Sequence, residues 1–513
     1  MKKLLVILLA FGLLVSLHAG GSRQAGAADG KMAITVGMWE FEKFGGDAVG
    51  DFIENKFNID IQPILQEWSD YQETFRLWAA SNQLPDTFSG YPPEEAWFAD
   101  FVSQGLIRSI PYSMISKYPN LKKVVDNHSL TQDVKANLGD FYFIPRPLIS
   151  YGTISNNMGI YYRKDWAEKL GYTNRPQDME TFYNMLRDFA LKDPDGNGRN
   201  DTYGYTGYAL NELYAGFGAF PGYWVKGTNN QYIPGWADEA PMIEALTWLR
   251  RAYSEGVLDP EFPRDYTVVA SKFAQGTFGA MGRSLDCYWI NRHVIEQFGG
   301  STPGVDPMKA VDYLAAMSSR QGGTPYHAPL IDSSGIVFRH DISDAKLEKL
   351  LELYDWLISD EGEAMRILGI KDVDYRVNSD GSLAPIGNTD PTALREKYPS
   401  IIIQIWPAWG ARLEEDVNEV FYPRSVIDAY REWVPVANTG STNALNKVGI
   451  LASVTPTDER ANFSFNDGVA LNAQLVRIIS GSGDVATMYR AFIADANSRG
   501  LQDVIRSVNN KLK

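Results

Sequence analysis

The chain has 513 residues, of which 44% are hydrophobic and 22% are charged, a balance that excludes a disordered polypeptide and a protein with many membrane spans. At about 150 residues per domain, this length predicts two or more folded bodies. The formal net charge of -15 at pH 7 repels phosphate backbones and anionic lipid surfaces, so we expect no nucleic-acid partner and no direct membrane binding.

The N-terminal residues follow the order of a secretory signal peptide. Lys2 and Lys3 precede an apolar run over 4–17, and small residues come next. We expect cleavage after Ala19 or, where the small-x-small pattern is better, after Ala27. The sequence therefore predicts an exported protein, either periplasmic or at the cell surface.

Cysteine and histidine are scarce in this chain. The single cysteine, Cys287, cannot form an internal disulfide, so we interpret it as a small buried side chain and expect stability to come from packing. No cysteine follows the N-terminal apolar run, so a lipid anchor attached through a thiol is not supported. The five histidines lack a metal-binding spacing, which disfavours a histidine-based metal site.

From residue 33 onward, short apolar runs alternate with helical patterns. The predicted elements, in chain order, are a strand over 33–37, a helix over 45–56, a strand over 59–65, a helix over 71–81, a strand after Leu84, a strand over 158–162, helices over 164–170 and 178–191, and one long leucine-striped helix over 345–368. This alternation indicates an α/β fold with mainly parallel sheets covered by helices. A second α/β body is expected to begin near residue 150.

The loop after residue 191 has the spacing of a calcium-binding loop. Acidic or amide side chains occupy positions one, three and five, glycine occupies position six, a carbonyl fits position seven and an acid fits position nine. The oxygen donors are Asp193, Asp195, Asn197, the carbonyl of Arg199, and Asp201. We predict a structural Ca²⁺ at this loop, because hard divalent cations prefer oxygen ligands.

Position twelve of the same loop departs from the usual pattern. It is Gly204, where a bidentate glutamate is typical, so water or a remote carboxylate would have to complete the coordination shell. The alternative is a solvated turn rich in Asp, Asn and Gly. The number of matching donor positions favours calcium over that alternative.

Several stretches match one pattern when they are taken in order. They cover residues 77–86, which end in Leu84-Pro85-Asp86, then 159–171, 193–204, 258–262, 273–276, 359–362 and 369–375. Together they resemble the extracellular solute-binding proteins of carbohydrate ABC importers, family 1, and in particular the lipoprotein-type, oligosaccharide-binding branch. The resemblance extends from about residue 33 to the C-terminus, and the ordered series is specific where each piece alone is weak. The cysteine that carries lipid in Gram-positive relatives is missing.

The resemblance implies a two-lobed periplasmic-binding-protein fold, type II-like, in which each lobe is a mainly parallel sheet flanked by helices and the ligand lies in a cleft between the lobes. We expect 28–145 to form the first part of lobe 1, 146–310 the first part of lobe 2, and 311–370 a return to lobe 1. Residues 371–513 should contain a hinge-crossing segment and C-terminal helices that lie mainly on lobe 2.

The family also implies partners and, in some polysaccharide-binding relatives, calcium. The expected partners are an oligosaccharide and the permease subunits of an ABC transporter, with a monomeric protein that performs no catalysis. At the calcium loop, the match covers Asp193, Asp195, Asn197, Arg199 and Asp201. Position ten, where relatives can carry an acid, is Thr202.

A sugar presents C–H faces and a rim of hydroxyls, so its site needs aromatic platforms and fixed polar groups. Open α/β sheets bind ligands at the loops after strand C-termini. The candidates on lobe 1 are Trp39, Glu40, Trp68, Tyr71 and Tyr91. The candidates on lobe 2 and in the inter-lobe segment are Trp224, Arg283, Trp289, Trp406 and Trp409.

Each candidate also has an ordinary structural interpretation. A single aromatic residue is more often part of a core, and Arg283 could be a surface cation paired with Asp286. Glu40 could act as a helix cap, because an acid near a helix start is favourable on its own. The set as a whole argues for a binding site more strongly than any one member.

Three functions compete for this sequence. The leading one is a binding protein that closes its lobes around an oligosaccharide and delivers it to a permease. A secreted glycoside hydrolase would need two carboxylates about 5 to 9 Å apart, and no local pattern pairs two acids. A sensor that presents its ligand to a signalling receptor would keep the fold and change the partner.

Overall fold

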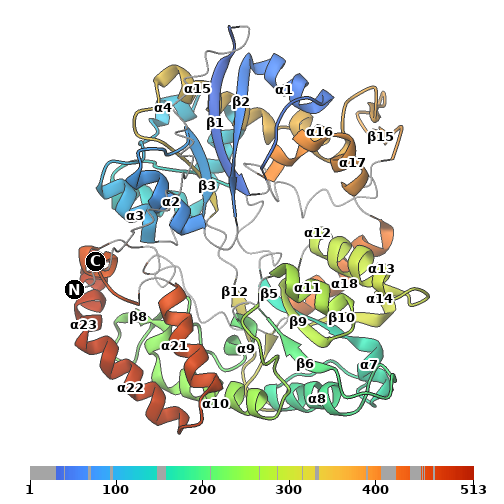
Figure 1. Ribbon diagram of the computed structural model, residues 1–513. Helices are drawn as coiled ribbons and strands as arrows, with labels where there is room; N and C mark the ends of the chain where they lie inside the picture. The colour runs from blue at the N-terminus through green and yellow to red at the C-terminus, as the bar shows by residue number, and fades with distance from the viewer. Residues whose placement is uncertain are drawn as a thin grey trace, which may run out of the picture.

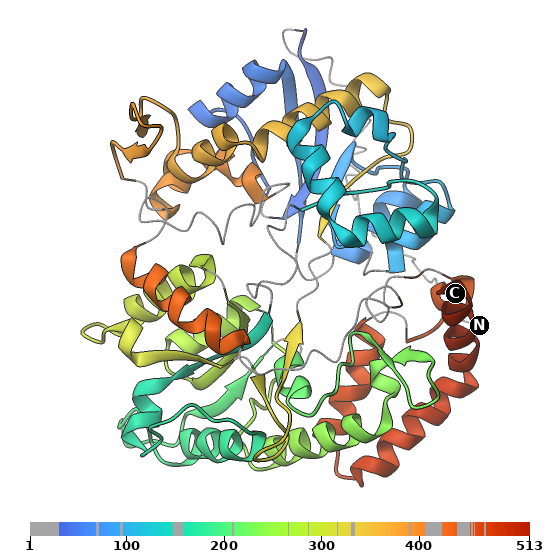
Figure 2. The same cartoon turned by 180° about the vertical axis from the view of Figure 1, so that it is seen from behind.

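The computed structural model describes residues 30–512 except for 40, 68–70, 93–95, 147–156, 208–209, 265, 286, 315, 330–333, 389–390, 406–422, 439–451, 453–454, 456 and 466–467. The described residues form two α/β bodies, one above the other in Figure 1, and the view from behind shows the same division (Figure 2). We call the upper body lobe 1 and the lower body lobe 2. The predicted signal peptide lies outside the described residues.

Lobe 1 is built on a five-stranded sheet with the order β2-β1-β3-β13-β4. Its strands are β1 (Met32–Trp39), β2 (Ile59–Gln66), β3 (Thr87–Gly90), β4 (Ile144–Pro145) and β13 (Gly335–Phe338). β1 is parallel to β2 and β3, whereas β13 is antiparallel to both β3 and β4. Apolar residues alternate along β1, so Ile34, Val36 and Met38 point to one face of the sheet and are all buried in the same core.

Helices cover both faces of this sheet. They are α1 (Ala48–Phe57), α2 (Tyr71–Ala80), α3 (Ala96–Ser103), α4 (Tyr112–Ile115), α5 (Pro119–Asn127), α6 (Ser129–Leu138), α15 (Asp344–Leu357), α16 (Asp360–Leu368), α17 (Pro391–Lys397) and the 3₁₀ helix η5 (Pro399–Ile405), with a small hairpin of β14 (Tyr375–Val377) and β15 (Leu383–Pro385). Asp47 caps α1 by accepting the backbone N–H groups of Val49 and Gly50 at 2.9 and 3.1 Å. Its other oxygen accepts the N–H of Ser400 at 2.8 Å, which ties η5 to lobe 1.

Lobe 2 contains a six-stranded sheet with the order β11-β12-β5-β9-β6, in which β10 also pairs with β5. The strands are β5 (Asn157–Arg163), β6 (Tyr203–Thr206), β9 (Phe278–Ser284), β10 (Val311–Leu314), β11 (Ala316–Met317) and β12 (Tyr326–Pro329), and a separate hairpin is formed by β7 (Trp224–Lys226) and β8 (Tyr232–Pro234). Successive residues of β5 alternate between two cores: Ile160 and Tyr162 belong to one, and Tyr161 to the other. The sheet is therefore covered on both faces.

The helices of lobe 2 divide between these two cores. They are α7 (Lys164–Lys169), α8 (Met179–Leu191), α9 (Asn211–Ala215), η3 (Gly235–Ala237), α10 (Glu239–Ser254), α11 (Tyr266–Ala274), α12 (Cys287–Trp289), the π-helix η4 (Ile290–Phe298), α13 (Gly299–Ser301), α14 (Pro307–Ala310), α18 (Arg424–Asn438), α20 (Asp458–Ala461), α21 (Gly468–Ser480), α22 (Val485–Ser498) and α23 (Leu501–Lys511). α8, α10 and α21–α23 supply one core, and α11, η4 and α18 supply the other. Cys287 is buried in the second core, as predicted.

Strand direction follows one rule in both sheets. β1, β2, β3 and β4 of lobe 1 run toward lobe 2, and β6, β9, β10 and β12 of lobe 2 run toward lobe 1. One strand in each sheet runs the opposite way: β5, with which the chain enters lobe 2, and β13, with which it returns to lobe 1. The short β11 is antiparallel to its neighbour β12. The expected α/β lobes with sheets flanked by helices are confirmed. The expectation of mainly parallel sheets is wrong: among the described strands, β1–β2, β1–β3 and β6–β9 are parallel pairs, whereas the pairs made by β13, β5 and β11 are antiparallel, because these strands run against their neighbours.

Two expected segment boundaries are wrong. The return to lobe 1 was expected at 311, but β10 and β12 complete the lobe 2 sheet, and the chain rejoins lobe 1 at β13. Asp312 fixes β10 there, because its carboxylate binds Arg175 at 2.5 Å and the hydroxyl of Tyr162 at 2.9 Å. The stretch after residue 371 was expected mainly on lobe 2, yet α17 and η5 stay in the lobe 1 core. The helices α18 and α21–α23 do lie on lobe 2, as expected.

The long helix expected over 345–368 is two helices, α15 and α16. The break follows Ile358, and Ser359 adopts an extended backbone with φ -80° and ψ 167°. Its hydroxyl accepts the N–H of Gly362 at 3.3 Å and so caps α16. The apolar stripe continued across the break, because both helices bury residues in the same core or beside it.

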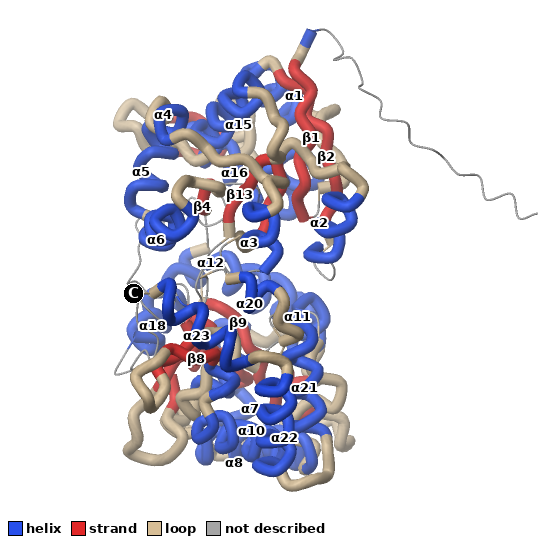
Figure 3. The backbone as a smooth tube through the Cα atoms, turned by 90° about the vertical axis from the view of Figure 1, so that its left-hand side faces the viewer, coloured by secondary structure: helices blue, strands red, loops and turns tan. Residues whose placement is uncertain are grey.

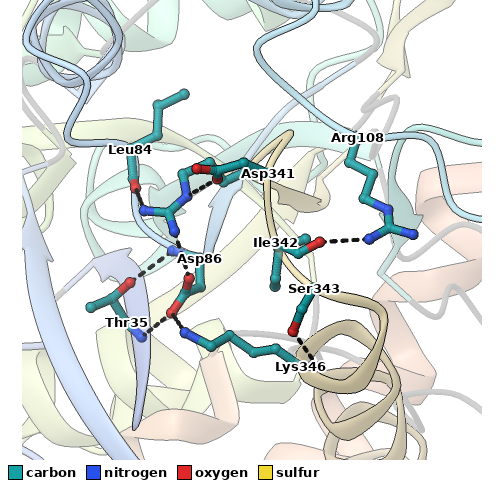
Figure 4. A network of polar contacts seen from close by, with 9 residues as sticks. Thr35, Leu84, Asp86, Arg108, Asp341, Ile342, Ser343 and Lys346 are labelled. Atoms are coloured by element: carbon teal, nitrogen blue, oxygen red, sulfur yellow. Dashed lines mark hydrogen bonds and ion pairs between the residues drawn. The ribbon is translucent and has the colours of Figure 1, made fainter. Parts of the chain in front are cut away.

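A buried carboxylate holds the far end of lobe 1 together, at the start of β3 (Figure 4). Asp86 is 3% exposed and accepts the N–H of Thr35 at 2.9 Å, the ammonium of Lys346 at 2.9 Å and the guanidinium of Arg339 at 3.2 Å. The hydroxyl of Thr35 accepts the N–H of Asp86 in return, at 2.8 Å. This network links the middle of β1, the start of β3, the residue after β13 and the first turn of α15.

The lobes touch through α20 and through Tyr223. α20 contacts α23 of lobe 2 and α3 of lobe 1, and it lies between these helices in the side view (Figure 3). Tyr223 of lobe 2 packs against an aromatic core of lobe 1 that includes Phe75 and Trp97. None of the described helices is both long and apolar enough to cross a lipid bilayer.

Candidate functional site

Three of the predicted sugar-contacting residues lie together at the edge of lobe 1 that faces lobe 2. Trp39 ends β1, Tyr71 begins α2 and Tyr91 follows β3. The ring of Trp39 meets that of Tyr71 edge-on at 5.4 Å and that of Tyr91 at 6.0 Å, with interplanar angles of 79° and 49°. The sheet order explains the grouping, because the C-terminal ends of neighbouring parallel strands meet at one edge. We call these three residues the aromatic edge cluster.

Within the aromatic edge cluster, the tryptophan and the tyrosines differ in exposure. Trp39 is 3% exposed, so it supports the cluster from below. Tyr71 and Tyr91 are partly exposed, and Phe75 backs Tyr71 at 5.5 Å. The rings that a ligand can reach are therefore those of the two tyrosines, which carry a hydroxyl as well as an aromatic face.

Polar side chains beside this cluster were missed from the sequence. Gln66, the last residue of β2, pairs with Trp39 across the sheet, and its amide donates to the carbonyl of Ser89 at 3.1 Å. The amide oxygen of Gln66 and the hydroxyl of Ser89 are buried with no hydrogen-bond partner among the described residues. Position near a strand end was the available signal, since Gln66 is the last residue of β2 and Ser89 is the last but one of β3.

On lobe 2, Arg283 and Trp289 lie together at the edge that faces lobe 1. Arg283 is near the end of β9, and its guanidinium carbon lies 3.6 Å from the centre of the Trp289 ring. Trp289 in turn stacks on His293 at 4.9 Å with an interplanar angle of 9°. We call these three residues the cationic stack.

The π-helix η4 builds the lower part of the cationic stack. It begins directly after Trp289 and carries His293, whose ring nitrogen Nδ1 is 2.7 Å from the side-chain oxygen of Gln297. Burial, followed by the charge of Arg283, lowers the pKa of His293 to about 3, so its imidazole is neutral at pH 7. π-helical turns are rare and occur often at functional sites. His293 was missed because the sequence gives no signal for π-helical register.

A buried carboxylic acid lies near the same edge of lobe 2. Glu212 in α9 is 5% exposed, accepts a hydrogen bond from the hydroxyl of Tyr205 and packs against the backbone of Gly282, where an added Cβ would meet the carboxylate. Burial raises the pKa of Glu212 to about 7. Glu212 can therefore be protonated near neutral pH.

The remaining candidates do not join these groups. Trp224 is 5% exposed and belongs to the main core of lobe 2, with the guanidinium of Arg460 over its ring at 5.8 Å, so its ordinary interpretation as a core residue holds. Four candidates lie outside the described residues: Glu40, Trp68, Trp406 and Trp409.

The side chains of the predicted calcium loop converge, although the loop is closed by its own hydrogen bonds. Asp193 accepts the N–H groups of Asn197 and Gly198, both at 3.0 Å. The amide nitrogen of Asn197 donates to Asp195 at 2.7 Å and to Asp201 at 3.1 Å. Among the described residues, no group of three or more acidic, histidine or cysteine side chains is arranged to hold a metal as it stands.

The carboxylates of Asp193 and Asp195 affect each other's pKa. Their interaction lowers the pKa of Asp193, while burial and the same interaction raise the pKa of Asp195. A cation held between two interacting carboxylates would stabilise the charged form of both. The donor set therefore fits a hard cation, provided that the amide of Asn197 rotates to present its oxygen.

The comparison with protein families settles the membership of the chain. Residues 41–364, more than half of the chain, match the family of bacterial extracellular solute-binding proteins. The chain belongs to this family. Its members and the similar solved structures are binding proteins rather than enzymes.

Among curated proteins, the chain is 29% identical over 208 residues to lipoprotein LipO of Bacillus subtilis, a match that covers 38% of each. It is 26% identical over 232 residues to the fructooligosaccharide-binding protein FusA of Streptococcus pneumoniae, covering 42% of this chain and 43% of FusA. It is 22% identical over 275 residues to the polygalacturonan/rhamnogalacturonan-binding protein YtcQ of B. subtilis. These matches span about two fifths to one half of the length of each relative.

The two-lobed architecture matches solved structures over nearly the whole chain. FusA of S. pneumoniae in complex with kestose has a TM-score of 0.67 at 18% identity, and the alginate-binding protein AlgQ2 without calcium has a TM-score of 0.69 at 17% identity. Each match covers 94% of this chain and 98% of the other. At this identity the likeness establishes the fold.

Proposed function

We propose that this protein is an exported receptor that holds an oligosaccharide between its two lobes and delivers it to an ABC permease without changing its covalent bonds. The observation that carries the proposal is the aromatic edge cluster, in which three strand-end segments bring Trp39, Tyr71 and Tyr91 together on the face of lobe 1 opposite lobe 2. Membership of an extracellular solute-binding family supports export, and the N-terminal 27 residues would act as the signal peptide. The sugar-binding relatives FusA and YtcQ support the ligand class.

Lobe closure would couple binding to delivery. The chain passes between the lobes after β4, after β12 and after η5, so each lobe is built from separated segments and can move as a rigid body. A ligand that contacts both lobes stabilises the closed form by its differential affinity for that form. The permease would then recognise the closed form.

A glycan screen tests this function. Purified mature protein should show a raised melting temperature and quenched tryptophan fluorescence with one class of oligosaccharide, because a ligand stabilises the folded state by mass action. Monosaccharides serve as the control for chain length, because a site that contacts several sugar rings should bind a single ring more weakly. A folded protein that responds to no oligosaccharide in a broad library would contradict the proposal.

The same samples separate binding from glycoside hydrolysis. After incubation for hours with a ligand identified in the screen, chromatography should recover the intact oligosaccharide. Release of shorter products, abolished by substitution of one carboxylate, would instead establish a hydrolase.

We also propose that the loop over 193–201 binds a structural Ca²⁺. Asp193, Asp195, Asn197, the carbonyl of Arg199, and Asp201 would hold the ion. The convergence of the loop's oxygen-bearing side chains supports this role, because Asn197 contacts both Asp195 and Asp201 and its backbone N–H is bound by Asp193. The ion would fix the connection between α8 and β6, far from the facing edges of the lobes.

A further inference from the structure

The faces of Trp289, a predicted sugar platform, are already covered. The guanidinium of Arg283 lies 3.6 Å from the ring centre, and the imidazole of His293 is parallel to the ring at 4.9 Å. Two planar groups at these distances cannot share one face without overlapping, so they lie on opposite faces. A sugar ring cannot stack on this tryptophan in this arrangement, and the group that ends the stack is the guanidinium.

The stack holds that guanidinium against the indole. Arg283 points to the same face of the sheet as Met281 and Leu285, whose side chains pack in the core that contains η4. Arg283 and Trp289 are both partly exposed, while Ser284 and Leu285 beside them are buried. A guanidinium has its N–H donors in one plane, the geometry that suits a two-oxygen anion such as a carboxylate, and contact with the indole limits the positions that it can adopt.

The cationic stack contains one charge. His293 is neutral, because burial holds its pKa at about 3, so Arg283 supplies the positive charge. The chain as a whole has a net charge of -15 and repels anions at long range. A fixed cation at the facing edge of such a protein favours an anionic group at one place on a ligand, rather than a uniformly charged polymer surface.

We propose that the ligand of this protein is an oligosaccharide that carries a carboxylate, and that Arg283 binds this carboxylate at the edge of lobe 2. The inference rests on the proposed oligosaccharide-binding function. Lobe 1 would contact the C–H faces of the sugar through Tyr71 and Tyr91, and lobe 2 would bind the acid. Arg283 then acts as a specificity-determining residue, and Trp289 and His293 act as positioning residues.

The test compares acids with their neutral methyl esters. The probes are trigalacturonate, trimannuronate and 3′-sialyllactose, each against its own methyl ester, in titration calorimetry with the wild-type protein. At least one acid should bind about 10- to 100-fold more tightly than its ester, the range expected for a charge-assisted hydrogen-bonded pair. The acid that binds distinguishes a uronate from a sialic acid.

Variants test whether Arg283 causes the preference for acid over ester. Arg283→Gln should abolish the preference of acid over ester, and Arg283→Lys should keep part of it, because an ammonium retains the charge without the planar pair of donors. The matched control is Arg251→Gln, since Arg251 also lies over a ring, 3.8 Å from Tyr183, but on the outer helix α10. This control should leave the preference intact. Thermal melting confirms that each variant is folded.

The experiment distinguishes failure of this inference from failure of the proposed function. If an ester or another neutral oligosaccharide binds as tightly as the acid, or if Arg283→Gln leaves the preference unchanged, the inference is wrong and the proposed function stands. If a folded wild-type protein binds neither acidic nor neutral oligosaccharides, the proposed function fails and the inference fails with it. The acid–ester comparison in the wild type does not depend on the folding of any variant.

Discussion

Aromatic rings make up the facing edge of lobe 1, whereas a guanidinium over a tryptophan makes up the corresponding edge of lobe 2. The aromatic edge cluster joins the end of β1, the helix that comes after β2 and the loop after β3, and these three strands are neighbours, so the cluster is a product of sheet order. The cationic stack joins β9 to a π-helix a few residues later in the chain, so it is a product of local helical register. The two edges therefore offer a ligand different chemistry, C–H contacts on one side and a charge on the other.

The largest effect is expected at the network that fixes lobe 1. Asp86→Asn should lower the free energy of unfolding by about 3 kcal/mol, because it removes the charge that Arg339 and Lys346 share in a buried position. Urea denaturation measures this loss. Asp341→Asn is the control, since Asp341 also pairs with Arg339 but is 57% exposed, and it should cost less than about 1 kcal/mol. Equal losses in both variants would show that Asp86 does not hold the strands in place.

Sequence patterns could predict most of the architecture and only one of the two edges. Trp39, Tyr71 and Tyr91 were found because a residue at a strand end lies at the sheet edge whatever the details of packing. The return to lobe 1 at β13 was missed, because helix–strand alternation does not say which sheet a strand joins or in which direction it runs. The stacking of Trp289 on His293 could not be predicted, because it depends on a π-helix. The burial of Trp224 could not be predicted either, because it depends on a core that forms only when α10 and α20–α23 assemble.

Calcium removal is expected to have the next largest effect. Saturating Ca²⁺ should raise the melting temperature by about 3 to 6 °C over the value with a chelator, because the ion binds the folded loop and not the unfolded chain. Asp195→Asn should abolish this difference, whereas Asp380→Asn, in an exposed loop of lobe 1, should leave it unchanged. Calorimetry with identical curves in Ca²⁺ and in chelator would contradict the calcium proposal.

Removing an accessible ring from lobe 1 should weaken ligand binding with little effect on folding. Tyr91→Ala is expected to raise the dissociation constant of the oligosaccharide found in the screen by about 10-fold, the loss of roughly 1.4 kcal/mol of aromatic contact. Tyr112→Ala removes an exposed tyrosine from α4 and should not change binding. If both variants bind as the wild type does, the aromatic edge cluster is not part of the site.

A further expected effect concerns the pH dependence of lobe 2. The pKa of Glu212 is about 7 in the folded protein and near its ordinary value of 4.5 in the unfolded chain, so the unfolded state releases this proton first as pH rises. The contribution of Glu212 to stability is therefore present below pH 4.5 and is lost as pH rises through 7, by up to about 3 kcal/mol. Relative to the wild type, Glu212→Gln should gain stability between pH 5 and pH 8 in urea denaturation. A constant difference across this range would show that Glu212 titrates normally.

Small-angle X-ray scattering of the protein with the oligosaccharide identified in the screen tests the two-lobe account most directly. Saturating ligand should lower the radius of gyration, and the sugar recovered afterwards should be intact. An unchanged radius of gyration at saturation, or recovery of cleaved sugar, would contradict closure of two lobes around an unaltered ligand.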